Sequence, residues 1–179
     1  MGNSKTRKLV MAALCVALGL ILPTVFHAVP NAGSIFLPMH LPVLLCGFIC
    51  GWPYGLVCGA LTPLLSSVLT SMPPLAILPG MLCELATYGF VSGMLYAHLH
   101  TPKRAVNLYG TLVLAMLAGR IVSGVLNALL FSVGTYSMQT WLAASFVTAL
   151  PGIVIQLVAV PVLVAVLQKA KLAEVPQRA

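Results

Sequence analysis

Long apolar runs, separated by short stretches of proline, glycine and polar residues, dominate this sequence. They cover residues 9–27, 40–51, 54–71, 79–99, 106–132 and 139–168. A helix needs roughly 20 residues to cross the apolar core of a bilayer. The second and third runs are short and meet at Trp52-Pro53-Tyr54, a turn whose aromatic side chains suit a membrane interface. The pattern predicts an all-α integral membrane protein, a compact six-transmembrane-helix bundle in which residues 1–179 form a single membrane domain.

Composition supports a membrane location. The chain is 60% hydrophobic and only 6% charged, whereas soluble domains average about 25% charged residues. Too few charges are present to cover a water-facing surface, so we expect membrane lipid around most of the chain. A basic start followed by an apolar run also resembles a secretory signal peptide. The length of that run and the membrane-like remainder favour a first membrane helix instead.

The basic residues predict the orientation of the bundle. The formal net charge is +7, and all basic residues except Arg120 lie in three clusters outside the apolar runs, at residues 5–8, 103–104 and 169–178. Six spans place the three clusters on one side, which the positive-inside rule identifies as cytoplasmic. We therefore expect cytoplasmic N- and C-termini in a multi-pass cell-membrane protein, and no nucleic-acid partner. Three uncharged outer loops, 27–40, 71–79 and 131–140, could fold over a cavity.

Several classes of function are disfavoured. The chain contains no phosphate-binding loop, no H-E-x-x-H and no G-x-S-x-G motif. Its two acidic residues, Glu84 and Glu174, are far apart in the sequence, so paired-carboxylate chemistry is not expected. The five cysteines form no Cys-x-x-Cys and fall within apolar runs, which indicates buried thiols. We expect no enzyme activity, no cofactor and no metal site.

Glycines in the second and third runs predict close helix packing. Gly47 and Gly51 form one G-x-x-x-G, and Gly55 and Gly59 form another across the turn. Small residues at this spacing make a flat face on which helix backbones approach closely. We expect these helices to pack tightly within the bundle.

Arg120, in the fifth run, is the main candidate for a functional residue. Placing an arginine near the bilayer centre costs roughly 2.5–3.5 kcal/mol on insertion scales, so it should face the bundle and have a partner. Ser123 and Asn127 share its helical face. The fourth run carries Glu84, the only other charge within the runs, with Tyr88 one turn later.

Two interpretations of these polar residues remain open. In one, Glu84 and Arg120 form a structural salt bridge. In the other, Arg120, Asn127, Glu84 and Gln156 line a substrate pocket open to the outer loops, with Tyr88 and Ser123 beside them. A carboxylate on the substrate would suit a bidentate contact with Arg120. His40 is either an interfacial residue or a ligand at the point where a lid meets the second helix.

The whole pattern resembles the substrate-binding S-components of energy-coupling factor (ECF) transporters. The resemblance covers the length, six helices, cytoplasmic termini, a basic N-terminus, an A-x-x-x-A pair at Ala13 and Ala17, and the stretch HLPVLLCGFICGWPYGLVCG from His40 to Gly59. Many members have Gly-Pro near the turn, whereas this chain has Gly51-Trp52-Pro53.

The resemblance implies a vitamin-binding subunit in a prokaryotic plasma membrane. Its partners would be a transmembrane coupling protein, contacted through Ala13 and Ala17, and two cytoplasmic ATPases. Nickel and cobalt members begin with Met-His, but this chain begins Met1-Gly2, which disfavours metal as the substrate. Arg120 favours a carboxylate-bearing vitamin such as pantothenate. Riboflavin, a pyridoxine-type vitamin, a thiamin precursor and a queuosine precursor stay open.

Two rival classes also stay open. One is a self-sufficient small carrier in which Glu84 couples transport to protons. The other is a membrane scaffold whose polar core is purely structural.

Overall fold

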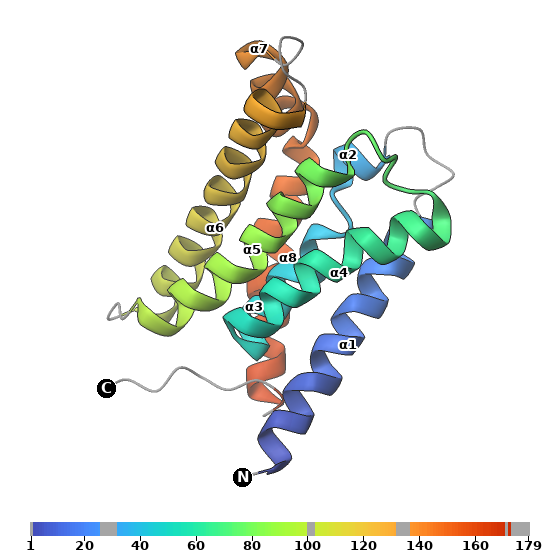
Figure 1. The fold of residues 1–179 in the computed structure, drawn as a ribbon. Helices are drawn as coiled ribbons and strands as arrows, with labels where there is room; N and C mark the ends of the chain where they lie inside the picture. Colours follow the sequence, from blue (N-terminus) through green and yellow to red (C-terminus); the bar gives the residue numbers. More distant parts are fainter. Residues whose placement is uncertain (1, 26–31, 100–102, 132–136, 171, 173–179) are drawn as a thin grey trace.

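The computed structural model describes residues 2–25, 32–99, 103–131, 137–170 and 172. Its helices are α1 (Gly2–Val25), α2 (Ala32–Phe36), α3 (His40–Cys50), α4 (Trp52–Thr70), α5 (Leu78–His98), α6 (Arg104–Leu126), α7 (Met138–Leu142) and α8 (Leu150–Lys169). Two π-helical segments, η2 (Asn127–Phe131) and η3 (Ala143–Thr148), follow α6 and α7. No strand occurs among these residues, and the expected all-α fold is confirmed (Figure 1).

Among the described residues, five segments are long and apolar enough to cross a membrane. They are Lys5–Val25, Ala32–Cys50, Trp52–Thr70, Arg104–Leu129 and Leu150–Lys169. Helix α5 has 21 residues and packs against α3, α4 and α6, but it contains a glutamate and three glycines that lower its hydropathy. The six-span count therefore stays a prediction, with α5 as the sixth helix of the bundle.

The structure corrects two of the expected ranges. The expected outer loop 27–40 contains α2, and a turn at residues 37–39 connects α2 to α3. The expected continuous helix 139–168 is divided into α7, η3 and α8, with a turn at Ala149. Pro151 has no backbone N–H, and it lies in the first turn of α8, where that donor is not needed. Residues 26–31 and 132–136 of the expected outer loops lie outside the described residues.

Glycines bring α4 very close to α5. A Cβ atom on Gly55 would collide with the backbone carbonyl of Gly89, and a Cβ on Gly89 would collide with that of Gly55. Gly59 lies in the same way against the carbonyl of Leu85. The expected close packing is therefore present. Gly51 has another role, because its φ of 93° lets the chain turn from α3 into α4, and this conformation favours glycine.

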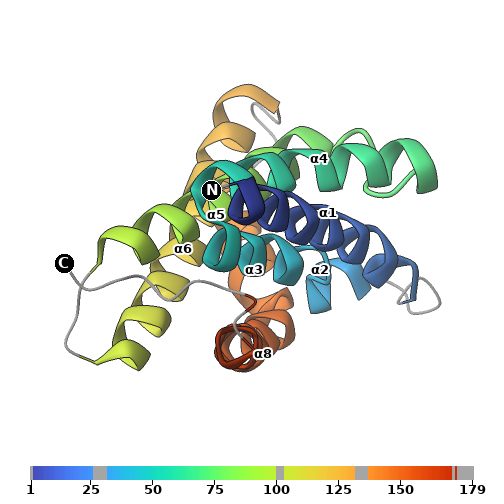
Figure 2. The same ribbon diagram turned by 90° about the horizontal axis from the view of Figure 1, so that it is seen from below.

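The other helices surround this glycine contact. Helix α1 packs on α3 and α4, α6 packs mainly on α5, and α8 lies against α2 and α3 (Figures 1 and 2). Large apolar side chains remain exposed along the outer faces of α1, α4, α6 and α8. That distribution suits a protein whose solvent is lipid.

One end of the bundle is basic. The first turns of α1, the start of α6 and the end of α8 lie together at the lower end in Figure 1. These segments carry Lys5, Arg7, Lys8, Arg104 and Lys169. Helix α7 and the π-helical segment η3 that follows it (residues 138–148), together called the α7 hairpin below, lie at the opposite end (Figure 1). The fold therefore separates a basic end from the end that carries α7.

Candidate functional site

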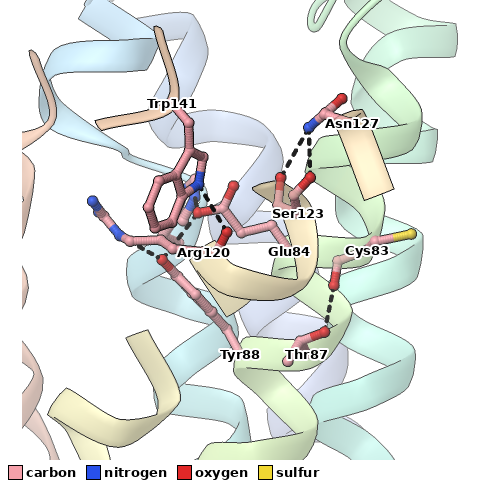
Figure 3. Close-up of polar contacts among 9 residues, drawn as sticks. Cys83, Glu84, Thr87, Tyr88, Arg120, Ser123, Asn127 and Trp141 are labelled. Carbon is pink, nitrogen blue, oxygen red and sulfur yellow. Dashed lines mark hydrogen bonds and ion pairs between the residues drawn. The ribbon is translucent and has the colours of Figure 1, made fainter. Parts of the chain in front are cut away.

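Arg120 faces the protein interior and contacts α5. Only 3% of the residue is exposed. Its Nε donates a hydrogen bond to the hydroxyl of Tyr88 over 3.1 Å, and that hydroxyl donates to Oε1 of Glu84 over 3.0 Å (Figure 3). Within the described residues, no ion pair joins Glu84 directly to Arg120. A tyrosine hydroxyl therefore links the two charges, and the direct salt bridge of the structural interpretation is not observed.

Helix geometry explains why these side chains meet. Glu84 and Tyr88 are four residues apart on α5, so they lie on one helix face. On α6, a Cβ atom at Gly119 would collide with the ring of Tyr88. The missing side chain at Gly119 lets the tyrosine ring lie against the α6 backbone beside Arg120.

His40, the first residue of α3, joins this group. Its Nε2 lies 3.6 Å from Oε1 of Glu84, and its ring meets the ring of Tyr88 edge-on, with centroids 5.3 Å apart. The side chain is buried. His40 is thus an interior residue in contact with the acidic side of the network, rather than a residue at an exposed interface.

Two aromatic residues of the α7 segment complete the surroundings of Arg120. The indole Nε1 of Trp141 donates to the backbone carbonyl of Arg120 over 3.1 Å. The ring centroid of Phe146 in η3 lies 5.4 Å from Cζ of Arg120, a cation–π distance. The two rings also meet edge-on.

Sequence reasoning missed Trp141 and Phe146. A usable signal existed, because Trp141 is one of only two tryptophans and it begins the sixth apolar run beside an outer loop. The sequence does not show which residues Trp141 contacts. In the fold its indole ring packs against Gly124 of α6, in the space that a Cβ atom there would occupy. That close approach depends on how the α7 hairpin folds back onto α6.

Ser123 and Asn127 form a separate local pair. Asn127 Nδ2 donates to the backbone oxygen of Ser123 over 2.8 Å and to its hydroxyl over 3.2 Å (Figure 3). Asn127 also packs against Gly80 at the start of α5. Among the described residues, no hydrogen bond joins this pair to Arg120. Their role as substrate contacts beside Arg120 stays a prediction.

Gln156 on α8 is fully buried. Neither its amide nitrogen nor its amide oxygen has a hydrogen-bond partner within the described part of the chain. The same is true of Nη1 of Arg120 and Nδ1 of His40. A buried polar group without a partner costs about 1–3 kcal/mol. Three helices, α3, α6 and α8, thus carry hydrogen-bonding groups that the described protein atoms leave unsatisfied.

These unsatisfied groups do not form a metal site. The described residues contain no group of three or more His, Cys, Asp or Glu side chains placed to hold a metal ion. All five cysteines have free thiols, and Cys15, Cys46, Cys50 and Cys58 are buried among apolar side chains.

A comparison with known families identifies the chain. The family model described as ECF transporter, substrate-specific component matches residues 7–164. The chain belongs to this family. The match extends from α1 into α8 and includes every residue of the Arg120 network. Comparisons with curated proteins and with solved structures found no match.

Family membership establishes the general role of the chain. It is a multi-pass membrane protein and the substrate-binding component of a transporter, which is not a class of enzyme. The resemblance seen in the sequence is confirmed. Arg120, Tyr88, Glu84 and His40 are the candidate substrate-binding residues that the fold brings together.

Proposed function

We propose that this S-component binds a vitamin or related micronutrient that bears a carboxylate, such as pantothenate, for import by an ECF-type ABC transporter. The observation that carries the proposal is the state of Arg120, which is almost fully buried and whose Nη1 has no hydrogen-bond partner within the described residues. A buried guanidinium in this state favours an anionic guest. Its planar fork matches a carboxylate.

The charges around Arg120 favour an anion over a cation. Glu84 already receives the Tyr88 hydroxyl, and His40 lies 3.6 Å from the same oxygen. Arg120 gives only Nε to Tyr88. The positive charge is therefore the less compensated of the two, and it would be compensated by a bound carboxylate. Asn127, Ser123 and Gln156 are proposed as further substrate contacts.

The substrate would enter from the exterior. The basic end of the bundle is the cytoplasmic one by the positive-inside rule, and we propose that both termini lie on that side. Arg120 precedes the end of α6 by six residues, in the half of the helix nearer the α7 hairpin. The proposed site is then closer to the outer surface of the membrane.

Helix α1 offers a surface for the coupling protein. Ala12, Cys15 and Gly19 face the bundle, with Gly19 against Thr62 of α4. Ala13 and Ala17 are exposed on the other face. Small exposed side chains let a second helix approach closely. We propose that Ala13 and Ala17 dock onto a transmembrane coupling protein that works with two cytoplasmic ATPases.

Substituting Arg120 tests the proposal. We expect Arg120→Ala to weaken pantothenate binding at least about 30-fold, because a buried charge-assisted contact is worth about 2 kcal/mol or more. Isothermal titration of the detergent-purified protein measures the affinity, and size-exclusion chromatography checks the fold. Thr111→Ala is the matched control, since Thr111 is buried on the same helix nearer the basic end.

Two other outcomes have clear meanings. If Arg120→Ala fails to fold while the folded fraction keeps its affinity, the role of Arg120 is structural. If the wild-type protein does not bind pantothenate but native mass spectrometry finds another co-purified acid, the vitamin is wrong and the role of Arg120 stands. A wild-type protein that carries and binds no small molecule would favour the scaffold alternative.

A further inference from the structure

Gln156 is a buried side chain whose amide has no hydrogen-bond partner at either end within the described structure. It has no solvent exposure. One turn earlier on α8, Gly152 lies against the backbone of Ile35 and Phe36 in α2. Helix α8 also contacts α3 and α6. Gln156 is therefore enclosed by protein on several sides and separated from bulk water.

The chemistry of an amide limits what can pair with it. The oxygen accepts hydrogen bonds and the nitrogen donates them. A carboxylate only accepts, so it satisfies the nitrogen and leaves the oxygen unpaired. An ammonium group only donates, so it satisfies the oxygen and leaves the nitrogen unpaired. A neutral amide or hydroxyl both donates and accepts, and either one satisfies the two atoms of Gln156 together.

Gln156 and Arg120 occupy comparable positions on neighbouring helices. Arg120 precedes Leu126, the end of α6, by six residues, and Gln156 follows Leu150, the start of α8, by six residues. Each residue is therefore about 9 Å along its helix from the end that leads into the α7 hairpin. No hydrogen bond joins the two side chains within the described residues. Each of the two groups therefore needs a hydrogen-bond partner of its own.

We infer that the solute has two chemically different ends, a carboxylate that meets Arg120 and a neutral amide or hydroxyl group that meets Gln156. This inference rests on the proposed function and narrows its substrate class. The site then discriminates against simple fatty acids, which lack the neutral group. It also discriminates against cationic vitamins, which lack the anion. An enclosed water is the competing partner for Gln156, since waters often satisfy buried polar groups.

The first test identifies the solute. Native mass spectrometry of the wild-type protein, followed by fragmentation of the released molecule, gives its functional groups. A carboxylate together with an amide or hydroxyl supports the inference. An acid without a neutral hydrogen-bonding group overturns the inference and leaves the proposed function intact. A protein without any solute overturns both.

The second test separates the two ends of the molecule. Pantothenate and its alcohol analogue, in which CH2OH replaces the carboxylate, are titrated into the wild type, Gln156→Met and Arg120→Gln. We expect Gln156→Met to weaken both compounds by about the same factor, tenfold or more. Arg120→Gln should weaken pantothenate and change its alcohol analogue little. Methionine keeps the length of the side chain, so the fold should be retained.

Gln168→Leu is the matched control. Gln168 is the other buried glutamine of α8, and it donates to the hydroxyl of Tyr96 near the basic end. We expect this variant to lower thermal stability without changing either affinity. If Gln156→Met keeps wild-type affinity for both compounds, a water satisfies Gln156 and the inference fails. The inference also fails if Gln156→Met weakens pantothenate alone, because Gln156 would then act on the carboxylate end.

Discussion

At the scale of single residues, the Tyr88 hydroxyl is the group that keeps Arg120 available. A direct salt bridge to Glu84 would use guanidinium N–H groups that could otherwise bind a carboxylate. The tyrosine hydroxyl instead takes Nε and passes a hydrogen bond on to Glu84. The arginine is thereby held in place while Nη1 stays without a protein partner within the described residues.

Replacing Tyr88 by phenylalanine should disrupt this arrangement. The change removes one hydroxyl and leaves Nε of Arg120 and one oxygen of Glu84 without their shared partner. We expect a loss of about 1.5–3 kcal/mol of stability, the range for hydrogen bonds to charged groups, and weaker pantothenate binding. Thermal unfolding and calorimetric titration measure the two effects.

Tyr96→Phe is the control for this prediction. Tyr96 lies two turns further along α5 and accepts a hydrogen bond from Gln168. Its substitution should reduce stability and spare binding. If Tyr88→Phe binds pantothenate as tightly as the wild type, Arg120 is positioned without the hydroxyl.

At the scale of elements, α5 connects the scaffold to the site. One face carries Leu85 and Gly89, which lie against the glycines of α4. The other carries Glu84 and Tyr88, which reach toward His40 of α3 and Arg120 of α6. The close α4–α5 contact therefore determines how far the polar face of α5 projects toward its partners.

Gly89→Ala tests the importance of this contact. The new Cβ would meet the backbone carbonyl of Gly55, so the two helices would have to separate. Overpacking of this kind costs about 1–3 kcal/mol. We expect a lower melting temperature of the purified protein. Gly110→Ala is the control, because no atom lies within 4 Å of a Cβ at that position, and equal stability of both variants would contradict the close approach.

Helix α1 carries a different prediction. Leucine at Ala13 or Ala17 should leave solute binding unchanged, because both side chains face away from the bundle. It should reduce transport at least about tenfold, since the larger side chain blocks close helix approach by a coupling protein. Binding is measured on the purified variant and transport in cells that depend on the solute. Normal uptake in both variants would remove α1 from the docking surface.

At the scale of the whole molecule, the fold places its polar groups at two ends with different roles. The basic residues of α1, α6 and α8 lie at one end. Arg120 lies in the half of α6 nearer to α7, which is at the opposite end of the bundle (Figure 1). Residues 7–164, which match the family model, contain no phosphate-binding loop motif. We propose that the energy for import comes from a coupling protein and ATPases on other polypeptides.

Reconstitution in liposomes tests whether import by this chain requires a coupling protein and ATPases. We expect the chain alone to show no solute accumulation under a proton gradient, and uptake to appear when the coupling protein, both ATPases and ATP are supplied. Scintillation counting of labelled pantothenate measures the uptake. Glu84→Gln distinguishes the rival carrier, since loss of gradient-driven uptake in that variant would assign proton coupling to Glu84.

The sequence alone predicted the fold class, the buried charged residues and the close packing of glycines, because each depends on local residue chemistry. In lipid, each backbone N–H and C=O group must be hydrogen-bonded within the protein, so a long apolar run forms a helix. The all-α fold could therefore be predicted from the apolar runs. The importance of Arg120 and Glu84 followed from the cost of burying charge. The spacing of Gly55 and Gly59 indicated close helix packing. This signal could be recognised in the sequence because both glycines belong to one helix.

Only the tertiary structure decided which groups meet. The Tyr88 link between Arg120 and Glu84, the entry of His40 and the position of Trp141 all join residues from different helices. Such contacts depend on the depth and rotation of whole helices, which a one-dimensional pattern does not specify. Ser123 and Asn127, by contrast, hydrogen-bond to one another over one helical turn, a local contact that needs no second helix.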